Sequence, residues 1–336
     1  MTQDFAGTFE SREGWVVITA WLLLLLPYSN QLGPAWPLPH GFPIQQVSSA
    51  KTLSGDELLK IGEVHDHQHH FHETLTYYQL ALFSYREHQQ SRGVATALVK
   101  IAQVYEQQGK IREAYVALQE AVPIFARSSD RGAHARALLV MGRISARLGH
   151  VEQARTSFNQ ALTLFNRVKD RHGWNESLVQ LGLLDVTDGL IEPGLSLLQQ
   201  ARQDARVRQD RGLQLGAAVA LGNAHWMADR GADARRYYDE GLQLADVERN
   251  MTIEALLRLR LAQLDSEEER PAEGIDLGKR ALFLSQTLHD PVTEAATLSL
   301  LADLYRRLGQ TVEADESEQR ARSIYRNRQI MVHGAR

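Results

Sequence analysis

The residues best suited to metal chemistry in this 336-residue sequence form one short histidine-rich tract, His65, His67, His69, His70 and His72. Histidines four residues apart face the same side of a helix. His65 and His69 could therefore chelate Zn²⁺, Cu²⁺ or Ni²⁺, with His72 as a third ligand. A lone histidine-rich tract is only a compositional signal, and no second ligand set occurs elsewhere in the sequence. We treat these three as weak metal candidates, with ordinary packing or a pH-sensitive first repeat as alternatives.

Other kinds of reactive chemistry are poorly represented in the sequence. There is no cysteine, which excludes a disulfide framework, a thiolate zinc site, an iron–sulfur cluster and a cysteine nucleophile. No glycine-rich phosphate-binding or dinucleotide-binding motif and no Gly-x-Ser-x-Gly elbow occurs. The formal net charge is −4, whereas nucleic-acid binders normally carry a basic excess. We therefore predict a protein that is not an enzyme, uses no cofactor and binds no nucleic acid.

A forty-residue repeat accounts for most of the chain, since shifting the sequence by forty residues aligns columns of like residues without gaps. One column is apolar: Ile61, Ile101, Met141, Leu181, Leu221, Leu261 and Leu301. The next contains only glycine and alanine: Gly62, Ala102, Gly142, Gly182, Gly222, Ala262 and Ala302. Seven copies, starting near Gly55, predict a stack of structural units in which each copy packs only against its neighbours.

Each copy has the pattern of two helices. In the second copy, Leu98, Ile101 and Tyr105 recur at spacings of three and four, and Gly109 is placed to end the helix in a left-handed conformation. A second apolar stripe follows this glycine. Before the first copy, residues 54–57 (Ser-Gly-Asp-Glu) read as a capping box. Small residues let the helices approach closely, and large residues fill the adjacent gaps.

These residues resemble the signature of the tetratricopeptide repeat family in its forty-residue form, over about residues 55–330. The signature is carried by Leu98, Ile101, Ala102, Tyr105, Ala114, Leu118 and Ala121, and it recurs from Leu138 to Ala161. The resemblance implies an all-α fold, a right-handed superhelical solenoid of about seven helix–turn–helix repeats. It further implies a scaffold or adaptor that binds a peptide or helix of a partner protein in a concave groove.

The resemblance also implies where the groove lies, at positions two, five, nine and twelve of each first helix, counting the copies from Gly55. On these positions the candidate partner-binding residues are Arg136, Arg143, Leu183, Val186, Val219, Asn223 and Trp226. One interpretation makes Trp226 an exposed anchor and Arg143 a contact for an acidic partner. Packing of the indole against the next helix, and a solvated or internally paired Arg143, are the alternatives. A carboxylate clamp of lysine and asparagine is not assembled, since only Asn223 matches it.

The N-terminal segment differs in composition from the repeats. Residues 15–26 are apolar or nearly so, Pro27 ends the run, and a proline-rich stretch follows. A run of this length suits a signal-peptide core or a packed helix better than a spanning helix, which needs about 20 apolar residues. Its flanks are acidic, unlike those of a secretory signal. Three interpretations remain open: a signal or membrane anchor, a helix capping the first repeat, and a wrongly assigned start.

We slightly favour membrane association or export through residues 15–27, with a cytoplasmic location as the alternative. The predicted organisation is an apolar segment at 1–28, a linker at 29–53, the solenoid at 54–330 and a tail at 331–336. The predicted function is a non-catalytic interaction scaffold whose partner is a protein or peptide. A peptide-responsive regulator and a self-assembling structural scaffold, which would form homo-oligomers, are the alternatives.

Overall fold

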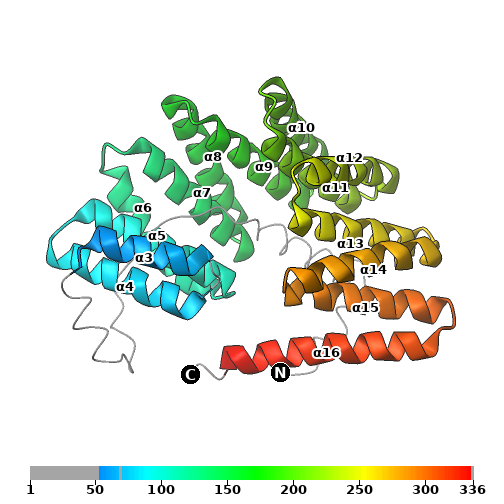
Figure 1. The fold of residues 1–336 in the computed structure, drawn as a ribbon. Helices are drawn as coiled ribbons and strands as arrows, with labels where there is room; N and C mark the ends of the chain where they lie inside the picture. Colours follow the sequence, from blue (N-terminus) through cyan, green and yellow to red (C-terminus); the bar gives the residue numbers. More distant parts are fainter. Residues whose placement is uncertain (1–52, 68–69, 334–336) are drawn as a thin grey trace. The chain divides into compact units, whose positions relative to one another are not determined.

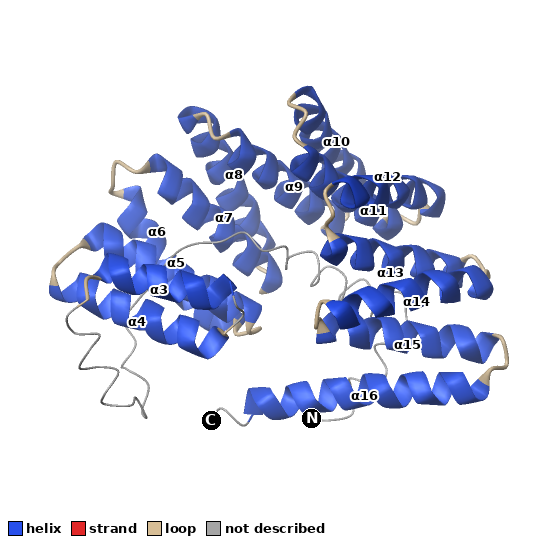
Figure 2. Cartoon of the chain, in the orientation of Figure 1, coloured by secondary structure: helices blue, strands red, loops and turns tan. Residues whose placement is uncertain are grey.

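The computed structural model describes residues 53–67 and 70–333, and within these ranges the chain is helical and contains no strand (Figures 1 and 2). The described ranges begin inside the predicted linker, so the apolar segment at residues 1–28 lies outside them. None of the helices described is both long enough and apolar enough to span a membrane. Membrane association through residues 15–27 therefore stays a prediction.

The described helices follow one another in seven pairs along the chain. In order they are α3 (Gly55–His67) and α4 (Phe71–Glu87), α5 (Ser91–Gln107) and α6 (Ile111–Ala126), α7 (Arg131–Arg147) and α8 (Val151–Val168), α9 (Arg171–Thr187) and α10 (Ile191–Val207), α11 (Arg211–Met227) and α12 (Gly231–Val247), α13 (Met251–Glu267) and α14 (Pro271–Thr287), and α15 (Pro291–Arg307) and α16 (Thr311–His333). From α4 onward, each helix begins forty residues before its counterpart in the next pair. The predicted all-α solenoid of forty-residue helix pairs is confirmed.

The chain divides into two compact units, residues 1–188 and residues 189–336. In the first unit, α4, α6 and α8 each pack between the first helix of their own pair and the first helix of the next. The first helices also contact one another, α3 with α5, α5 with α7 and α7 with α9. In the second unit α12 and α14 pack in the same way, and α13 contacts α15. Each unit therefore has a side formed by first helices, which we call its first-helix face.

Local sequence signals set the helix ends. Gly109, Gly149, Gly189 and Gly309 have φ between +74° and +85°, the left-handed conformation predicted for them. Ser54 and Glu57 form the predicted capping box, since the Ser54 N–H donates to Glu57 Oε2 at 2.8 Å and the Glu57 N–H donates to Ser54 Oγ at 3.3 Å. The side chains at the N-caps of α7, α9, α11, α13 and α15 each accept a backbone N–H; these residues are Asp130, Asp170, Asp210, Asn250 and Asp290.

Paired small and large residues bring the two helices of a repeat together. A Cβ atom added to Gly142 would lie 2.4 Å from the ring of Phe158, and one added to Gly222 would lie 2.4 Å from the ring of Tyr238. Both distances are far below van der Waals contact, so each aromatic ring lies directly on a glycine backbone. Glycine at these two positions therefore admits the aromatic ring of the residue sixteen positions later, in keeping with the expectation that small residues let the helices approach.

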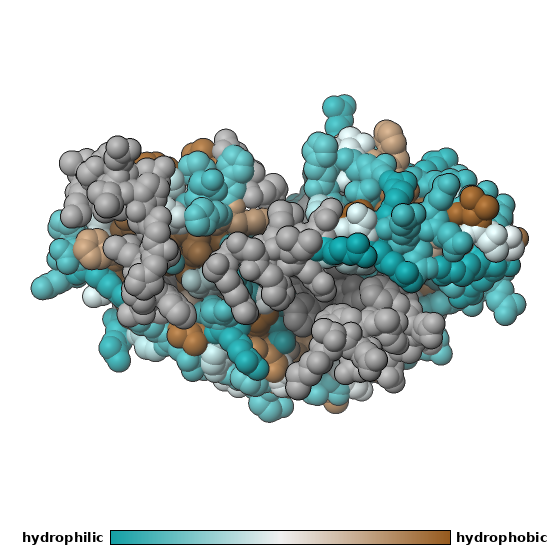
Figure 3. Space-filling view, turned by 90° about the horizontal axis from the view of Figure 1, so that it is seen from below, coloured by the Kyte–Doolittle hydropathy of each residue, from teal (hydrophilic) through white to brown (hydrophobic). Residues whose placement is uncertain are grey.

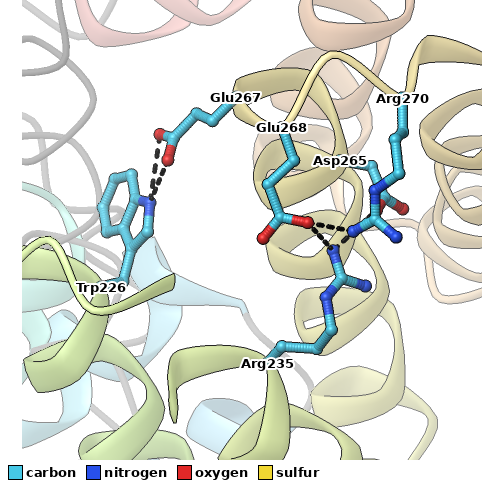
Figure 4. Close-up of polar contacts among 6 residues, drawn as sticks. All are labelled: Trp226, Arg235, Asp265, Glu267, Glu268 and Arg270. Atoms are coloured by element: carbon cyan, nitrogen blue, oxygen red, sulfur yellow. Dashed lines mark hydrogen bonds and ion pairs between the residues drawn. The ribbon is translucent and has the colours of Figure 1, made fainter. Parts of the chain in front are cut away.

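Two junctions between neighbouring repeats are built on ion pairs. In the first unit, Arg155 of α8 pairs with Asp185 of α9 and, at 2.7 Å, with Asp188. In the second unit, Arg235 of α12 lies 2.6 Å from Asp265 of α13 and 3.3 Å from Glu268, as Figure 4 shows. Both aspartates are almost completely buried. The two junctions are equivalent in the repeat, and the sequence analysis did not find either of them.

Candidate partner-binding face

Position nine of the first helix is polar in six of the seven copies. These residues are Glu63, Gln103 and Arg143 in the first unit and Asn223, Gln263 and Asp303 in the second, with Leu183 as the exception. Gln103, Arg143, Asn223 and Gln263 are each less than a tenth exposed. Buried polar groups need hydrogen-bond partners. The contacts of this polar column therefore show which of its side chains are already bonded inside the protein.

In the first unit, Arg143 lies in a buried network of charges. Its Nη2 is 3.1 Å from Glu106 Oε2 and its Nη1 is 3.5 Å from Glu176 Oε1. Arg147 also pairs with Glu106, at 3.7 Å. Burial alone would lower the pKa of Arg143, but the carboxylates of Glu106 and Glu176 more than compensate and hold its pKa above the usual value. Arg143 is therefore paired inside the protein, as in the alternative interpretation of the sequence.

A second buried cation of the first unit is also paired with an acid. Lys100 is 1% exposed, and its Nζ lies 2.6 Å from Glu63 Oε1 and 5.5 Å from the ring centroid of Tyr78. Burial lowers the pKa of Lys100, and the Glu63 carboxylate opposes that shift. Lys100 and Arg143 thus each have a carboxylate supplied by the preceding first helix.

The expectation of an exposed indole at Trp226 is wrong. The side chain is 3% exposed, and its Nε1–H donates to both carboxylate oxygens of Glu267 on the next first helix, at 3.1 Å each (Figure 4). The guanidinium of Arg260 lies 5.8 Å from the indole ring centroid. The indole packs against the following helix because that helix offers both an acceptor for its N–H and a cation near its ring.

Asn223 is held at both ends of its amide. It is 1% exposed, its Oδ1 accepts the hydroxyl of Tyr238 at 2.7 Å, and its Nδ2 donates to the Val219 carbonyl at 2.7 Å. Burial raises the pKa of Tyr238, so this phenol stays protonated and keeps donating. The amide therefore links α11 to α12.

The remaining sequence candidates range from buried to exposed. Val186 and Val219 are buried, and Leu183 is partly buried. The Arg136 side chain is 53% exposed, with Asp170 3.8 Å away. Arg136 also lines a hollow of about 640 Å³ between α3, α5 and α7, in which Arg92 is paired with Asp130. Of the predicted contacts, Arg136 is thus the most accessible. The structure brings Arg136, Arg143, Leu183 and Val186 together on the first unit, and Val219, Asn223 and Trp226 on the second.

Two of the three histidine candidates lie in the described part of the chain. The ring of His65 stacks on Tyr77 at 5.3 Å between centroids, with the planes 7° apart, while His72 is exposed. His69 lies outside the described residues. In the described part of the chain, no three His, Asp or Glu side chains are grouped as a metal site would require. A metal site that includes His69 stays a prediction.

Arg260 of α13 is the residue that the sequence analysis missed. It is 2% exposed, and its Nη1 donates to Gln263 Oε1 at 2.8 Å. Burial lowers the pKa of Arg260 to about 10, and the nearby Tyr238 only partly opposes this shift. Arg260 occupies position six of its repeat, outside the four groove positions that the family resemblance assigns. The available signal was a positively charged residue within an otherwise apolar helix face.

In Figure 3 the described residues of the visible face are mostly hydrophilic, with hydrophobic ones in small groups between them. The fold and the first-helix faces together define a class of protein, a solenoid of helix pairs with a column of polar residues along the first helices.

The helix pairs have the fold of tetratricopeptide repeats. A family model described as a tetratricopeptide repeat matches residues 93–167, which span α5 to α8. The sequence matches no curated protein significantly.

Solved structures with the same fold come from Rap proteins. A Rap protein complexed with competence and sporulation factor is 14% identical, with a TM-score of 0.63 over 98% of this chain and 88% of that one. The Rap conjugation gene regulator of plasmid pLS20, in complex with a Phr peptide, is 14% identical, with a TM-score of 0.62 over 95% of this chain and 85% of that one. Aspartyl phosphate phosphatase F from Bacillus subtilis is 12% identical, with a TM-score of 0.63 over 84% and 73%. At these identities the likeness concerns the fold alone.

Proposed function

We propose that this protein is a non-catalytic interaction scaffold that binds a peptide or helix of a partner protein on a first-helix face. The observation that carries the proposal is the polar column of buried side chains on first helices. A repeat that only had to stack could place apolar residues there, as it does at Leu183. Buried polar groups fix the position and orientation of side chains, which a peptide-binding surface needs.

The fold neighbours support the same interpretation. Two of them were solved with a peptide or with competence and sporulation factor bound, and each has the same fold over nearly all of this chain. The neighbouring phosphatase has an enzymatic name. In this chain, however, the charged groups described on the first-helix faces are mostly engaged in internal ion pairs, which leaves little for catalysis.

Peptide selection followed by hydrogen exchange tests the proposal. Peptides from a random library would be selected on the immobilised full chain, and amide exchange would then be compared with and without a selected peptide. We expect slower exchange in first helices such as α5, α7, α11 and α13, and little change in α6, α8, α12 and α14. Slower exchange confined to second helices would contradict the proposed face.

Substitutions in the first unit sharpen this test. Arg136→Glu and Leu183→Ala alter accessible or partly buried positions of the first-helix face, and we expect each to weaken peptide binding at least tenfold if the peptide lies there. Arg167→Glu on α8 is the matched control, since Arg167 is exposed on a second helix. If all three variants bind the peptide with the same affinity as the unmodified chain, the first unit is not part of the proposed site.

A peptide-responsive regulator is the second candidate, favoured by the neighbour that is a conjugation gene regulator bound to a Phr peptide. A regulator must bind a second partner whose affinity changes when the peptide binds. The two candidates are distinguished by measuring that second affinity with and without saturating peptide. Self-assembly stays a prediction, which light scattering at several protein concentrations would test.

A further inference from the structure

His225, in the last turn of α11, is a titratable residue buried in the packing of the second unit. Its side chain is 6% exposed, and neither Nδ1 nor Nε2 forms a hydrogen bond with any of the described residues. The ring stacks on Tyr237 of α12, with 5.2 Å between the centroids and 21° between the planes. A neutral imidazole leaves one N–H unsatisfied in this place, whereas an imidazolium would bury two N–H groups and a charge.

The carboxylates near His225 are already paired with arginines. Asp233 of α12 has its Oδ2 3.8 Å from His225 Nδ1, and its Oδ1 lies 3.1 Å from Nη2 of Arg236. On α10, the other helix packed closely against α11, Glu192 pairs with Arg230. Burial lowers the pKa of His225 and the two arginines lower it further, while the two carboxylates oppose this shift. A proton on His225 would therefore add a positive charge to ion pairs that are already complete.

Equivalent positions in the neighbouring repeats show how charge is compensated in this column. Forty residues before and after His225 the chain has Asp185 and Asp265, and each pairs with an arginine thirty residues earlier in the sequence. Thirty residues before His225 the chain has Leu195, which is 3% exposed and cannot compensate a charge. The column thus supplies an ion pair at two junctions between repeats. At the intervening junction, of α10 with α11, it supplies a titratable residue and an apolar one.

We propose that His225 is a pH switch in the packing of α11 against α10 and α12, closed while the imidazole is neutral and opened locally when it takes up a proton. An imidazolium that pairs with Asp233 displaces Arg236, whose guanidinium lies 4.9 Å from the ring centroid of Tyr237. Either way, one positive charge of this group is left without a counter-ion. Trp226 follows His225 on the same helix, so the opening reaches the first-helix face of the second unit. Weaker peptide binding in acid follows from this, and that consequence alone rests on the proposed function.

The direction of the pH dependence follows from the pKa of His225. Because this pKa is lower in the folded protein, the unfolded chain takes up the proton more readily. The closed packing is therefore fully stable above the unfolded pKa of about 6.5, and stability is lost as the pH falls from there toward the folded pKa. Asp239 of α12 acts in the opposite direction, since burial raises its pKa and its protonation favours the folded state. The other histidine of the second unit whose side chain is described, His289, is exposed.

Hydrogen exchange of the full chain at about pH 8 and about pH 5.5 tests the switch, since these values lie on either side of the usual histidine pKa. Exchange rates would be divided by the intrinsic rate at each pH, so that only the opening equilibrium remains. We expect the opening of α11 and α12 to increase at least about threefold at the lower pH. The helices α5 and α6, which contain no histidine, should change little. Equal opening of α11 at the two pH values would overturn the proposal.

Substitutions assign the effect to the proton on His225. His225→Tyr introduces the residue that the same column has at Tyr105 and Tyr305, and we expect it to abolish the pH dependence of α11. His225→Phe is a second variant that takes up no proton and should give the same result. His65→Tyr is the matched control, because His65 holds the same position in the first repeat and also stacks on a tyrosine. It should leave the pH dependence of α11 unchanged, as should Asp239→Asn. A pH dependence that persists in both variants of His225 would overturn the assignment.

A peptide selected on the full chain at about pH 8 connects the switch with the proposed function. It would contain no His, Asp or Glu, so that its own titration does not contribute. Its affinity should fall at least about threefold at about pH 5.5 for the unmodified chain, and by less for His225→Tyr. An equal fall in the two proteins, or no fall, would show that the switch does not control binding. If no peptide binds, the scaffold function fails, and hydrogen exchange still decides whether His225 is a switch.

Discussion

Buried cations of the two units differ in whether a carboxylate lies beside them. In the first unit, Lys100 and Arg143 each have a carboxylate 37 residues earlier in the sequence, Glu63 at 2.6 Å and Glu106 at 3.1 Å. In the second unit, the residue 37 positions before Arg260 is Asn223, whose amide is already engaged by Tyr238 and by Val219. The same spacing thus places a carboxylate beside each cation in the first unit, whereas in the second unit Arg260 has no carboxylate partner among the described residues.

This difference concerns the pairing of buried charges within one repeated architecture. Helix packing is alike in the two units, with Gly142 under Phe158 in the first and Gly222 under Tyr238 in the second. The ion-pair junctions of Arg155 and Arg235 are alike as well. What differs is whether the charged groups of the first-helix face have partners inside the protein. The charges of Arg143 and Lys100 are satisfied by neighbouring repeats, whereas Arg260 has no carboxylate partner among the described residues.

Removing the paired arginine should have the largest effect. Arg143→Met leaves Glu106 and Glu176 buried with less compensation, and we expect a loss of about 3–5 kcal/mol in unfolding free energy. Hydrogen exchange in α7 is the appropriate measurement, because repeat proteins do not always unfold in a single step. The exposed Arg167→Met is the control, expected to change stability by less than about 0.5 kcal/mol. A loss below about 1 kcal/mol would mean that the network of Arg143 contributes little.

Packing substitutions test whether the two units are otherwise equivalent. Gly142→Ala and Gly222→Ala should each destabilise the protein, because overpacking against the ring costs up to about 3 kcal/mol, whereas replacing glycine in a helix gains at most about 1 kcal/mol. Adding Phe158→Leu to Gly142→Ala should recover stability, because Ala102 and Leu118 occupy those two positions in the preceding repeat.

Exchange rates of the core amides would measure both effects. Costs that differ strongly between the two glycines would show that the units are packed differently. In that case the difference between Arg143 and Arg260 could not be attributed to their partners alone.

Helix capping gives a smaller effect with a defined pH dependence. Asp130→Ala and Asp210→Ala should each cost about 1 kcal/mol, because each carboxylate accepts a backbone N–H at the start of its helix. The N–H of Ala133, together with the charge of Arg92, holds the pKa of Asp130 below its usual value despite partial burial. A lowered folded-state pKa means that the stabilisation is present above the unfolded pKa of about 3.9 and is lost as the pH falls through the folded value.

Thermal melts between pH 2 and pH 6 would detect this dependence. Asp130→Asn, which still accepts the N–H, should keep much of the capping and show a weaker decline in acid. An identical decline in Asp130→Asn would assign the acid sensitivity to other carboxylates.

Removing the unpaired arginine should have the smallest effect on stability. Arg260→Met eliminates a buried charge without a counter-ion, and we expect a change within about 1 kcal/mol, neutral or stabilising. The measurement is hydrogen exchange in α13, made alongside that of α7 in Arg143→Met. A destabilisation as large as that of Arg143→Met would show that Arg260 is structural, and the contrast between the units would disappear.

The periodic features of the fold could be predicted from the sequence because they depend on residue type and spacing alone. The forty-residue period, the glycine positions after first helices and the capping box of Ser54 all follow from local backbone preferences. The match between a glycine and an aromatic residue sixteen positions later is also visible in the sequence once the period is known.

Burial and pairing of polar groups depended on tertiary structure. The sequence placed Trp226 and Arg143 at groove positions of first helices. It could not show that their N–H groups would donate to Glu267 and Glu106 of neighbouring repeats. Those partners lie about 40 residues away, so only the packing of one repeat on the next brings them into contact. The same packing buries Arg260 without a carboxylate partner in the part of the chain that the structure describes. Sequence thus determined the repeat and its helices, and tertiary structure decided which charges are neutralised, because neutralisation requires contact between repeats.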